Sequence, residues 1–257
     1  NLDLSIGSED LEGIYSVGVD PTKRAPQELF NIETSDAKVA STNGEILPEK
    51  TAKITGIRSE YCNHFYGTPE DTFYEIQYNE NGFEITDTLI VPYKVIAEGE
   101  EYTVTEVGLL VENNATPGAV INTANLPLIE TIIYPNTVEN LIVGTDVSSD
   151  NVGYIEGSEG TRLKKVVLPD KINLIPDHMF DHAYYLEEVK MSDNVTEIGK
   201  SAFYMCKNLK KINLSSSLTT IGASAFARSG LIEIEIPSTV NNIGSIAFSN
   251  CNSLEEI

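Results

Sequence analysis

The chain has 257 residues, of which 41% are hydrophobic and 22% are charged, and these proportions are ordinary for a globular protein. With 39 Asp and Glu against 17 Lys and Arg, its formal net charge is −22. So acidic a surface repels nucleic-acid phosphates and anionic lipid headgroups, which argues against both as partners. No apolar run approaches the roughly 18 residues of a membrane-spanning helix, so we expect no transmembrane segment.

The N-terminal part of the chain shows no internal repeat. Residues 1–72 are polar and contain turn signals such as Asn43-Gly44 and Pro48. Two alternatives stay open for this non-repeat segment, a small β module or a partly ordered leader. The alternating pattern of residues 73–88 predicts a strand that caps the repeats of the second half of the chain. We therefore divide the chain after residue 72 and expect the repeat domain to span residues 73–257.

The repeat itself is clearest in the second half of the chain. Units begin at Leu163, Leu186, Leu209, Leu231 and Leu254, with spacings of 23, 23, 22 and 23 residues. Upstream the same pattern is interrupted by insertions, which gives irregular units over residues 89–162 and regular units over 163–257. We expect the stack to begin near Leu89, in an entry unit with its own insertion. A fixed period of this kind indicates units that bury one another's apolar faces.

Each unit translates into local structure through the spacing of its apolar residues. The opening Val166 and Leu168 lie two apart, as on one face of a short strand. Apolar residues three apart come next, and then a short helical turn is expected to carry an Ala-Phe pair. Stacking the units aligns one column of isoleucines, from Ile175 to Ile243, beside one column of phenylalanines. The aligned phenylalanines are Phe180, Phe203, Phe226 and Phe248.

The frame L-x-x-I-x-(L/I)-P-x-x-V-x-x-I-G-x-x-A-F-x-x-C-x-x-L resembles the BspA-like leucine-rich repeats of surface and secreted proteins of bacteria and some protists. Departures are Pro176 and Met179 in the first unit and a missing residue, with Gly230, in the third. The resemblance implies the α/β class, as a right-handed leucine-rich-repeat solenoid with short parallel strands and short helical turns, plus an irregular N-terminal region.

The same resemblance implies a non-catalytic protein-binding or adhesion module, extracellular or at the cell surface. Its partner would be a protein of the host extracellular matrix or of another cell surface. Two other classes stay open, because fold alone does not determine function. One is a structural spacer or stalk that presents another domain, and the other is an enzyme with its site in the 144–160 insertion.

Two groups of residues have spacings that can bind a metal ion. Residues 177–182 place two histidines four apart beside carboxylates, but the other units hold Ser, Met and Arg there, so we predict a solvated helical face. Asp146, Ser148 and Asp150 are spaced as in a calcium loop. Because the loop lacks Gly at its sixth position and Glu at its twelfth, we predict a flexible acidic loop instead.

Signals for catalysis are absent from the sequence. There is no G-x-S-x-G and no glycine-rich phosphate loop, and a catalytic triad would have only His64, His178 and His182 as bases. We therefore predict no catalytic residue, no bound metal and no cofactor. Cys206 and Cys251 occupy the same position two units apart, which predicts a separation too large for a disulfide.

Two surfaces are candidates for protein binding. On the strand face, charges of opposite sign alternate between adjacent units and are expected to pair. This face is either self-neutralised or a mixed-charge surface for a protein ligand. Its candidate residues are Lys165, Glu188, Lys190, Lys211, Asn213, Glu233 and Glu235.

The second candidate surface is the rim after the expected helical turn. There His182, Tyr184 and Tyr185 should neighbour Tyr204 and Met205 of the next unit. Aromatic and Met side chains are enriched at protein interfaces, so the rim is either a binding patch or a shield for the turn. The last strand leaves an edge open, which predicts end-to-end self-association there or further residues.

Overall fold

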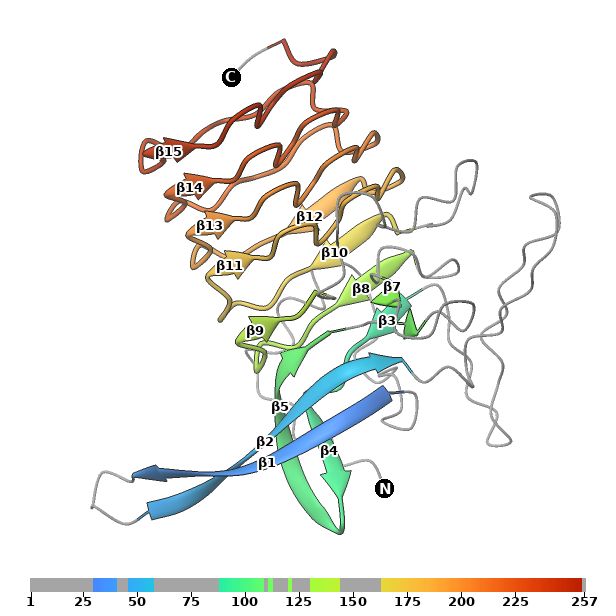
Figure 1. The fold of residues 1–257 in the computed structure, drawn as a ribbon, viewed down its shortest axis with the longest axis vertical. Coiled ribbons are helices and arrows are strands. Elements are labelled where there is room, and N and C mark those ends of the chain that lie inside the picture. Colours follow the sequence, from blue (N-terminus) through green and yellow to red (C-terminus); the bar gives the residue numbers. More distant parts are fainter. Residues whose placement is uncertain are drawn as a thin grey trace, which may run out of the picture.

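The computed structural model describes residues 30–40, 46–57, 88–108, 111–112, 120–121, 130–143 and 163–255. In these parts of the chain the elements are strands, β1 to β15, which form three sheets (Figure 1). Two of the sheets are short parallel ladders that run along the repeats, and the third gathers the N-terminal strands.

The first ladder opens successive units. It joins β3 (Thr88–Ile90), β8 (Thr131–Ile133), β10 (Lys165–Val167) and β12 (Glu188–Lys190), all parallel and in register. Among the described residues this ladder therefore begins at β3, which contains Leu89. The opening strands expected in the next two units do not form. There, isolated bonds join the coils, as when the Ile232 N–H donates to Lys210 O at 2.9 Å.

The second ladder carries the isoleucine column. It joins β11 (Leu174–Ile175), β13 (Glu197–Ile198), β14 (Thr220–Ile221) and β15 (Asn242–Ile243), again parallel and in register. Figure 1 shows these strands stacked along one edge of the coils. The isoleucines of β11, β13 and β14 are fully buried, as predicted. The expectation fails for Ile243, which is 50% exposed because β15 has no further coil beside it among the described residues.

A hairpin forms the described part of the N-terminal region. Strands β1 (Phe30–Ala40) and β2 (Ile46–Ile57) pair antiparallel, and β2 then pairs parallel with β5 (Glu100–Val107) and with β6 (Val111–Glu112). Buried side chains of both hairpin strands, Phe30, Ala52 and Ile54, belong to the same apolar core as the repeats. The hairpin thus contributes to the core at the β3 end of the stack.

An antiparallel pair of strands follows β3 in the expected entry unit. After β3 the chain forms β4 (Lys94–Ala97), turns at Gly99 and returns as β5, whose far end pairs with β9 (Asn140–Leu141). Strand β6 pairs with β7 (Val120–Ile121) nearby in the sequence. The capping strand predicted at residues 73–88 lies outside the described residues except for its last residue, which opens β3.

The phenylalanine column is the centre of the repeat core. The ring centres of Phe180 and Phe203 lie 5.3 Å apart, those of Phe203 and Phe226 5.2 Å, and those of Phe226 and Phe248 5.5 Å. The last two pairs are within 5° of parallel. Parallel rings at this spacing remove both faces of the inner rings from water, so Phe203 and Phe226 are 0% exposed. The predicted column is confirmed.

The prediction of short helical turns around these phenylalanines is wrong, because the described residues contain no helix. The backbone N–H groups alternate between two kinds of acceptor. Those of His178, Phe180 and His182 donate to carbonyls of the next coil, at 2.8 to 2.9 Å, whereas the intervening N–H groups close local turns. A helix would direct every N–H to its own coil, so the contact between coils replaces helical bonds at every second residue.

Left-handed residues recur at both ends of this turn segment. Non-glycine residues have positive φ at the same two positions of each unit, including Ile246 with φ of 53°. A β-branched residue is strained in this region, where Asn is tolerated. Because the Ile246 side chain is also 66% exposed, little packing offsets the strain.

Replacing Ile246 with Asn is therefore expected to raise the free energy of unfolding by about 1 kcal/mol. Urea denaturation followed by circular dichroism measures the change. The matched control is Ile243→Asn, which is similarly exposed but lies in β15. That variant is expected to lose stability, and a loss in both variants would contradict the strain argument.

Candidate functional site

The strand face pairs its charges between neighbouring coils. Lys165 Nζ lies 3.1 Å from Glu188 Oε2, and Lys211 Nζ lies 2.6 Å from Glu233 Oε1. The hydrogen bond to Glu233 raises the pKa of Lys211. All four side chains are about half exposed, so solvent screens both pairs and they add little to stability. The predicted pairing is confirmed, and it neutralises much of this face.

Only part of the strand face is open. Val167 occupies the fifth position of its unit, as Lys190 does in the next, but it is only 5% exposed. With Ile90 and Ile133, which are in register with it, Val167 forms a small apolar cluster separate from the main core. From β12 onward the same position holds Lys190, Asn213 and Glu235, all exposed. The open part of the face therefore starts at β12.

The rim brings together the aromatic residues that the sequence placed there. The His182 ring centre is 5.7 Å from that of Tyr184, edge to face, and 5.4 Å from that of Tyr204 in the next coil. The His182 N–H donates to Tyr204 O at 2.9 Å, so the two coils are held in register at this point. His182, Tyr184, Tyr185, Tyr204 and Met205 are all half-buried. We call these five residues the aromatic rim.

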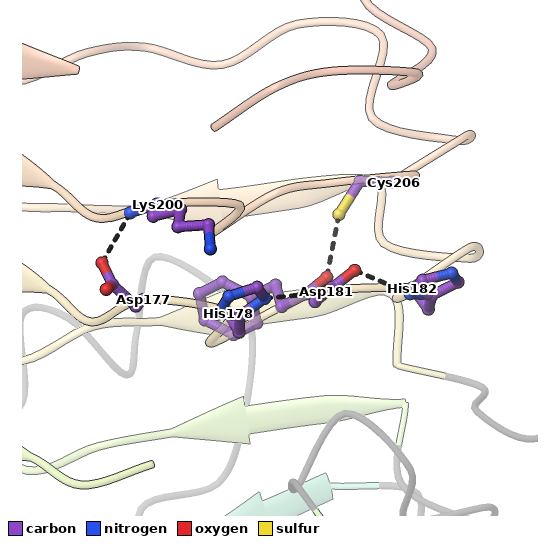
Figure 2. Close-up of polar contacts among 7 residues, drawn as sticks. Asp177, His178, Asp181, His182, Lys200 and Cys206 are labelled. Carbon is purple, nitrogen blue, oxygen red and sulfur yellow. Dashed lines mark hydrogen bonds and ion pairs between the residues drawn. The ribbon is translucent and has the colours of Figure 1, made fainter. Parts of the chain in front are cut away.

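A buried carboxylate lies behind the aromatic rim. The Asp181 side chain is 5% exposed, with its Oδ2 2.8 Å from His178 Nδ1 and its Oδ1 2.6 Å from His182 Nδ1 (Figure 2). Asp181 forms a hydrogen bond with His178. Its contact with His182 has the distance of an ion pair but not the geometry of a hydrogen bond. The prediction of a solvated helical face is therefore wrong. Positive φ at both histidines turns the chain so that both rings flank the carboxylate.

Cys206 is buried directly above Asp181, in the next coil (Figure 2). Its Sγ donates to Phe180 O at 3.2 Å, and Cys251 makes the equivalent bond to Phe226 O at 3.0 Å. Both thiols are free, as predicted. Burial, and secondly the charge of Asp181, raise the pKa of the Cys206 thiol well above its ordinary value.

Cys206 is therefore expected to be inert toward thiol reagents in the folded protein. In a variant that carries Ser at positions 62 and 251, 5,5′-dithiobis(2-nitrobenzoic acid) should leave Cys206 unmodified, because the thiolate is the reactive form. Urea should release one equivalent of reactive thiol. Full reaction without denaturant would show that the coil opens locally.

Several predicted positions lie outside the described residues. These are the calcium-like loop with Asp146, Ser148 and Asp150, the remainder of the 144–160 insertion, and His64. Within the described ranges, no three His, Cys, Asp or Glu side chains come together as a set that could hold a metal ion. The same ranges contain no helix long and apolar enough to span a membrane.

Lys207, which no sequence pattern singled out, adds a cation beside the aromatic rim. Its Nζ lies 4.6 Å from the ring centre of Tyr184, a cation–π contact between neighbouring coils. The buried contact of Asp181 with the two histidines was not predicted either. The equivalent residues in the other units are Tyr204, Ala227 and Ser249. A single carboxylate among such residues was the available signal.

Comparison with known proteins finds a family model that matches the C-terminal part of the chain. Residues 157–257 match the model of the BspA type leucine rich repeat region, in six copies. A search of the curated proteins found no relative.

Solved structures of bacterial leucine-rich repeat proteins resemble this chain at low identity. A protein from Bacteroides ovatus is 20% identical, over 88% of this chain and 39% of its own, with a TM-score of 0.45. A leucine rich cell surface protein from Faecalibacterium prausnitzii is 19% identical, over 87% and 53%, with a TM-score of 0.48. The T. pallidum leucine rich repeat protein is 17% identical, over 90% and 69%, with a TM-score of 0.41. The chain thus spans about two fifths of the first and half of the second.

Proposed function

Because residues 157–257 match the model of the BspA type leucine rich repeat region, we propose that the protein is a non-catalytic protein-binding module that acts outside the cell or at its surface. In this proposal the stacked coils form a right-handed solenoid within a repeat domain over residues 73–257, which comes after the N-terminal region 1–72. The ligand is a protein of the host extracellular matrix or of another cell surface. Attachment, rather than chemistry, is the activity.

The aromatic rim is the observation that carries this proposal. Tyr184 and Tyr204 come from neighbouring coils and are held at fixed positions by the His182 ring between them. Tyrosines in fixed positions contribute large contact areas and lose little conformational entropy on binding. The strand face is a weaker candidate, because its exposed charges already pair with one another. Its open residues, Lys190, Asn213 and Glu235, stay in the proposal as the edge of the binding surface.

The proposal is tested by retention of the full chain on immobilised matrix proteins such as collagen, laminin and fibronectin. The double variant Tyr184→Ala/Tyr204→Ala is expected to bind roughly tenfold or more weakly, as for a central interface residue. Tyr93→Ala is the matched control, since Tyr93 is also half-buried but belongs to the entry unit. Thermal unfolding must show that the variants remain folded.

The same measurement distinguishes the spacer alternative. A spacer would keep its attachment in the rim variant and in Lys190→Ala, but would lose function when whole coils are deleted. The enzyme alternative would need turnover on a substrate panel that is lost on mutation of residues 144–160. Either result would overturn the binding module.

End-to-end self-association is a separate part of the proposal, supported by the coil over residues 231–255. Its Ile243 and Ile246 are 50% and 66% exposed, whereas Ile221 in the preceding coil is buried. The stretch 236–254 has no charged residue, so two copies can meet there without repulsion despite a net charge of −22 each. Light scattering should give a dimer for the chain and a monomer for Ile246→Glu. A monomer for both would exclude this contact.

A further inference from the structure

A basic stretch interrupts the acidic chain next to the aromatic rim. Between Ile198 and Ile232 the sequence contains no Asp or Glu, although the whole chain has 39. The same stretch contains five of the 17 basic residues. They are Lys200, Lys207, Lys210, Lys211 and Arg228. Lys211 pairs with Glu233 on the strand face, so the others decide the local charge near the rim.

Three of these residues flank the aromatic rim and are exposed. Lys207 Nζ lies over Tyr184, and Lys210 Nζ donates to Lys207 O at 3.0 Å. The Lys210 ammonium also lies close to Gly230, two residues beyond Arg228, because a Cβ at Gly230 would be 2.9 Å from it. Arg228 occupies the position that Met205 holds one coil earlier, and the Met205 N–H donates to the adjoining Ala227 O at 3.0 Å.

Lys207, Lys210 and Arg228, which we call the basic patch, form no ion pair with an acidic residue in the described part of the chain. Cationic groups that no carboxylate of the described residues neutralises can pair with a partner's carboxylates. The aromatic rim beside them offers rings and the Met205 thioether. A ligand that matches both features has carboxylates adjacent to apolar side chains.

We infer that the basic patch and the aromatic rim together bind a short acidic segment of the protein ligand, an inference that rests on the proposed function. The Arg228 guanidinium can donate two parallel hydrogen bonds to one carboxylate, and the two lysines supply point charges. The tyrosines and Met205 contact the apolar side chains between the carboxylates. The aromatic contacts supply affinity, and the basic residues determine which segment is chosen.

A long polyanion such as a sulfated glycan fits this surface less well. The patch spans only neighbouring coils, and exposed acidic residues come before and after it in the sequence, Glu187 before and Glu233 and Glu235 after. Screening confines the attraction to about 8 Å at physiological salt. A short peptide segment stays within this range, whereas an extended polyanion continues onto the acidic surface and is repelled.

The experiment measures retention of the full chain on an array of short peptides. Each acidic peptide is paired with the same sequence carrying Asn for Asp and Gln for Glu, and heparin oligosaccharides form a separate set. We expect the acidic peptides to retain roughly tenfold more protein than their neutral counterparts at about 0.15 M salt. The triple variant Lys207→Gln/Lys210→Gln/Arg228→Gln should abolish this preference.

A matched control keeps the net charge equal. The triple variant Lys53→Gln/Lys94→Gln/Lys171→Gln also removes three positive charges, from lysines that pair with glutamates elsewhere on the surface. It should keep the preference for acidic peptides. Equal loss in both triple variants would assign the effect to net charge and overturn the inference.

The remaining outcomes separate this inference from the proposed function. Retention that is equal for acidic and neutral peptides, but is lost in Tyr184→Ala/Tyr204→Ala, would overturn the acidic ligand and keep the binding module. Stronger retention of heparin than of any peptide would also overturn it, in favour of a glycan. Unchanged binding to matrix proteins in the tyrosine variant would instead overturn the proposed function.

Discussion

Replacing Phe203 with alanine is expected to lower the free energy of unfolding by about 3–5 kcal/mol. The ring is 0% exposed and is stacked between Phe180 and Phe226, at 5.3 and 5.2 Å. Its removal leaves a cavity that the two neighbouring rings cannot fill, because the hydrogen bonds between coils fix their spacing. The loss therefore combines the transfer free energy of the ring with a cavity term. Urea denaturation followed by circular dichroism gives the value.

Phe248→Ala is the internal control for this prediction. Phe248 occupies the same position one coil beyond Phe226, but it is only partly buried and stacks on one ring, at 5.5 Å. Its truncation is expected to cost clearly less than that of Phe203, since solvent already reaches the site. Equal losses in the two variants would show that the stack does not provide the core stability assigned to it.

The phenylalanine column could be predicted from the sequence because it depends only on the period. Units of nearly constant length place each phenylalanine in register with the next, independently of the backbone conformation between them. The upstream strand β8 follows the same period, because its buried Ile132 pairs in register with Val166 of the first regular unit. Apolar spacing therefore predicts which side chains stack between neighbouring coils.

The backbone of the turn segment could not be predicted in the same way. Its residues are compatible with a helix, and the outcome depends on whether each N–H finds an acceptor in its own coil or in the next. The bond from Phe180 N–H to Ala202 O, 2.8 Å long, belongs to the stack and not to the local sequence. Tertiary context overrides local propensity here, as it does for many short segments.

In the candidate site, too, some contacts could be predicted from the sequence and others could not. The pairing of Lys165 with Glu188 could be predicted from the alternating charges of adjacent strands, and the contact of His182 with Tyr204 from the register. The burial of Asp181 could not, because it depends on left-handed residues that no pattern of side chains specified. Register is readable from the period, whereas side-chain direction is not.

The glycine before the fourth regular unit is expected to be the least tolerant of a larger residue. The preceding unit is one residue shorter than its neighbours, and Gly230 crosses directly over the backbone of Lys207. A Cβ at Gly230 would lie 1.8 Å from Lys207 O, so the two coils would have to separate. The Gly230 N–H also donates to Cys206 O at 3.0 Å, and this bond would be lost. Gly230→Ala should therefore cost about 3 kcal/mol or more.

Gly99→Ala distinguishes close approach from backbone strain. Gly99 has a φ of 81°, but no atom lies within 4 Å of its virtual Cβ, so alanine there meets only the left-handed penalty of about 1–2 kcal/mol. Chemical denaturation should rank the Gly230 variant as the more damaged of the two. Because Lys207 and Lys210 both lie against Gly230, its variant should also lose the preference for acidic peptides, while Gly99→Ala keeps it. The opposite ranking would mean that there is space for a methyl group between Gly230 and Lys207. It would also mean that the contact between these two coils does not hold the basic patch in place.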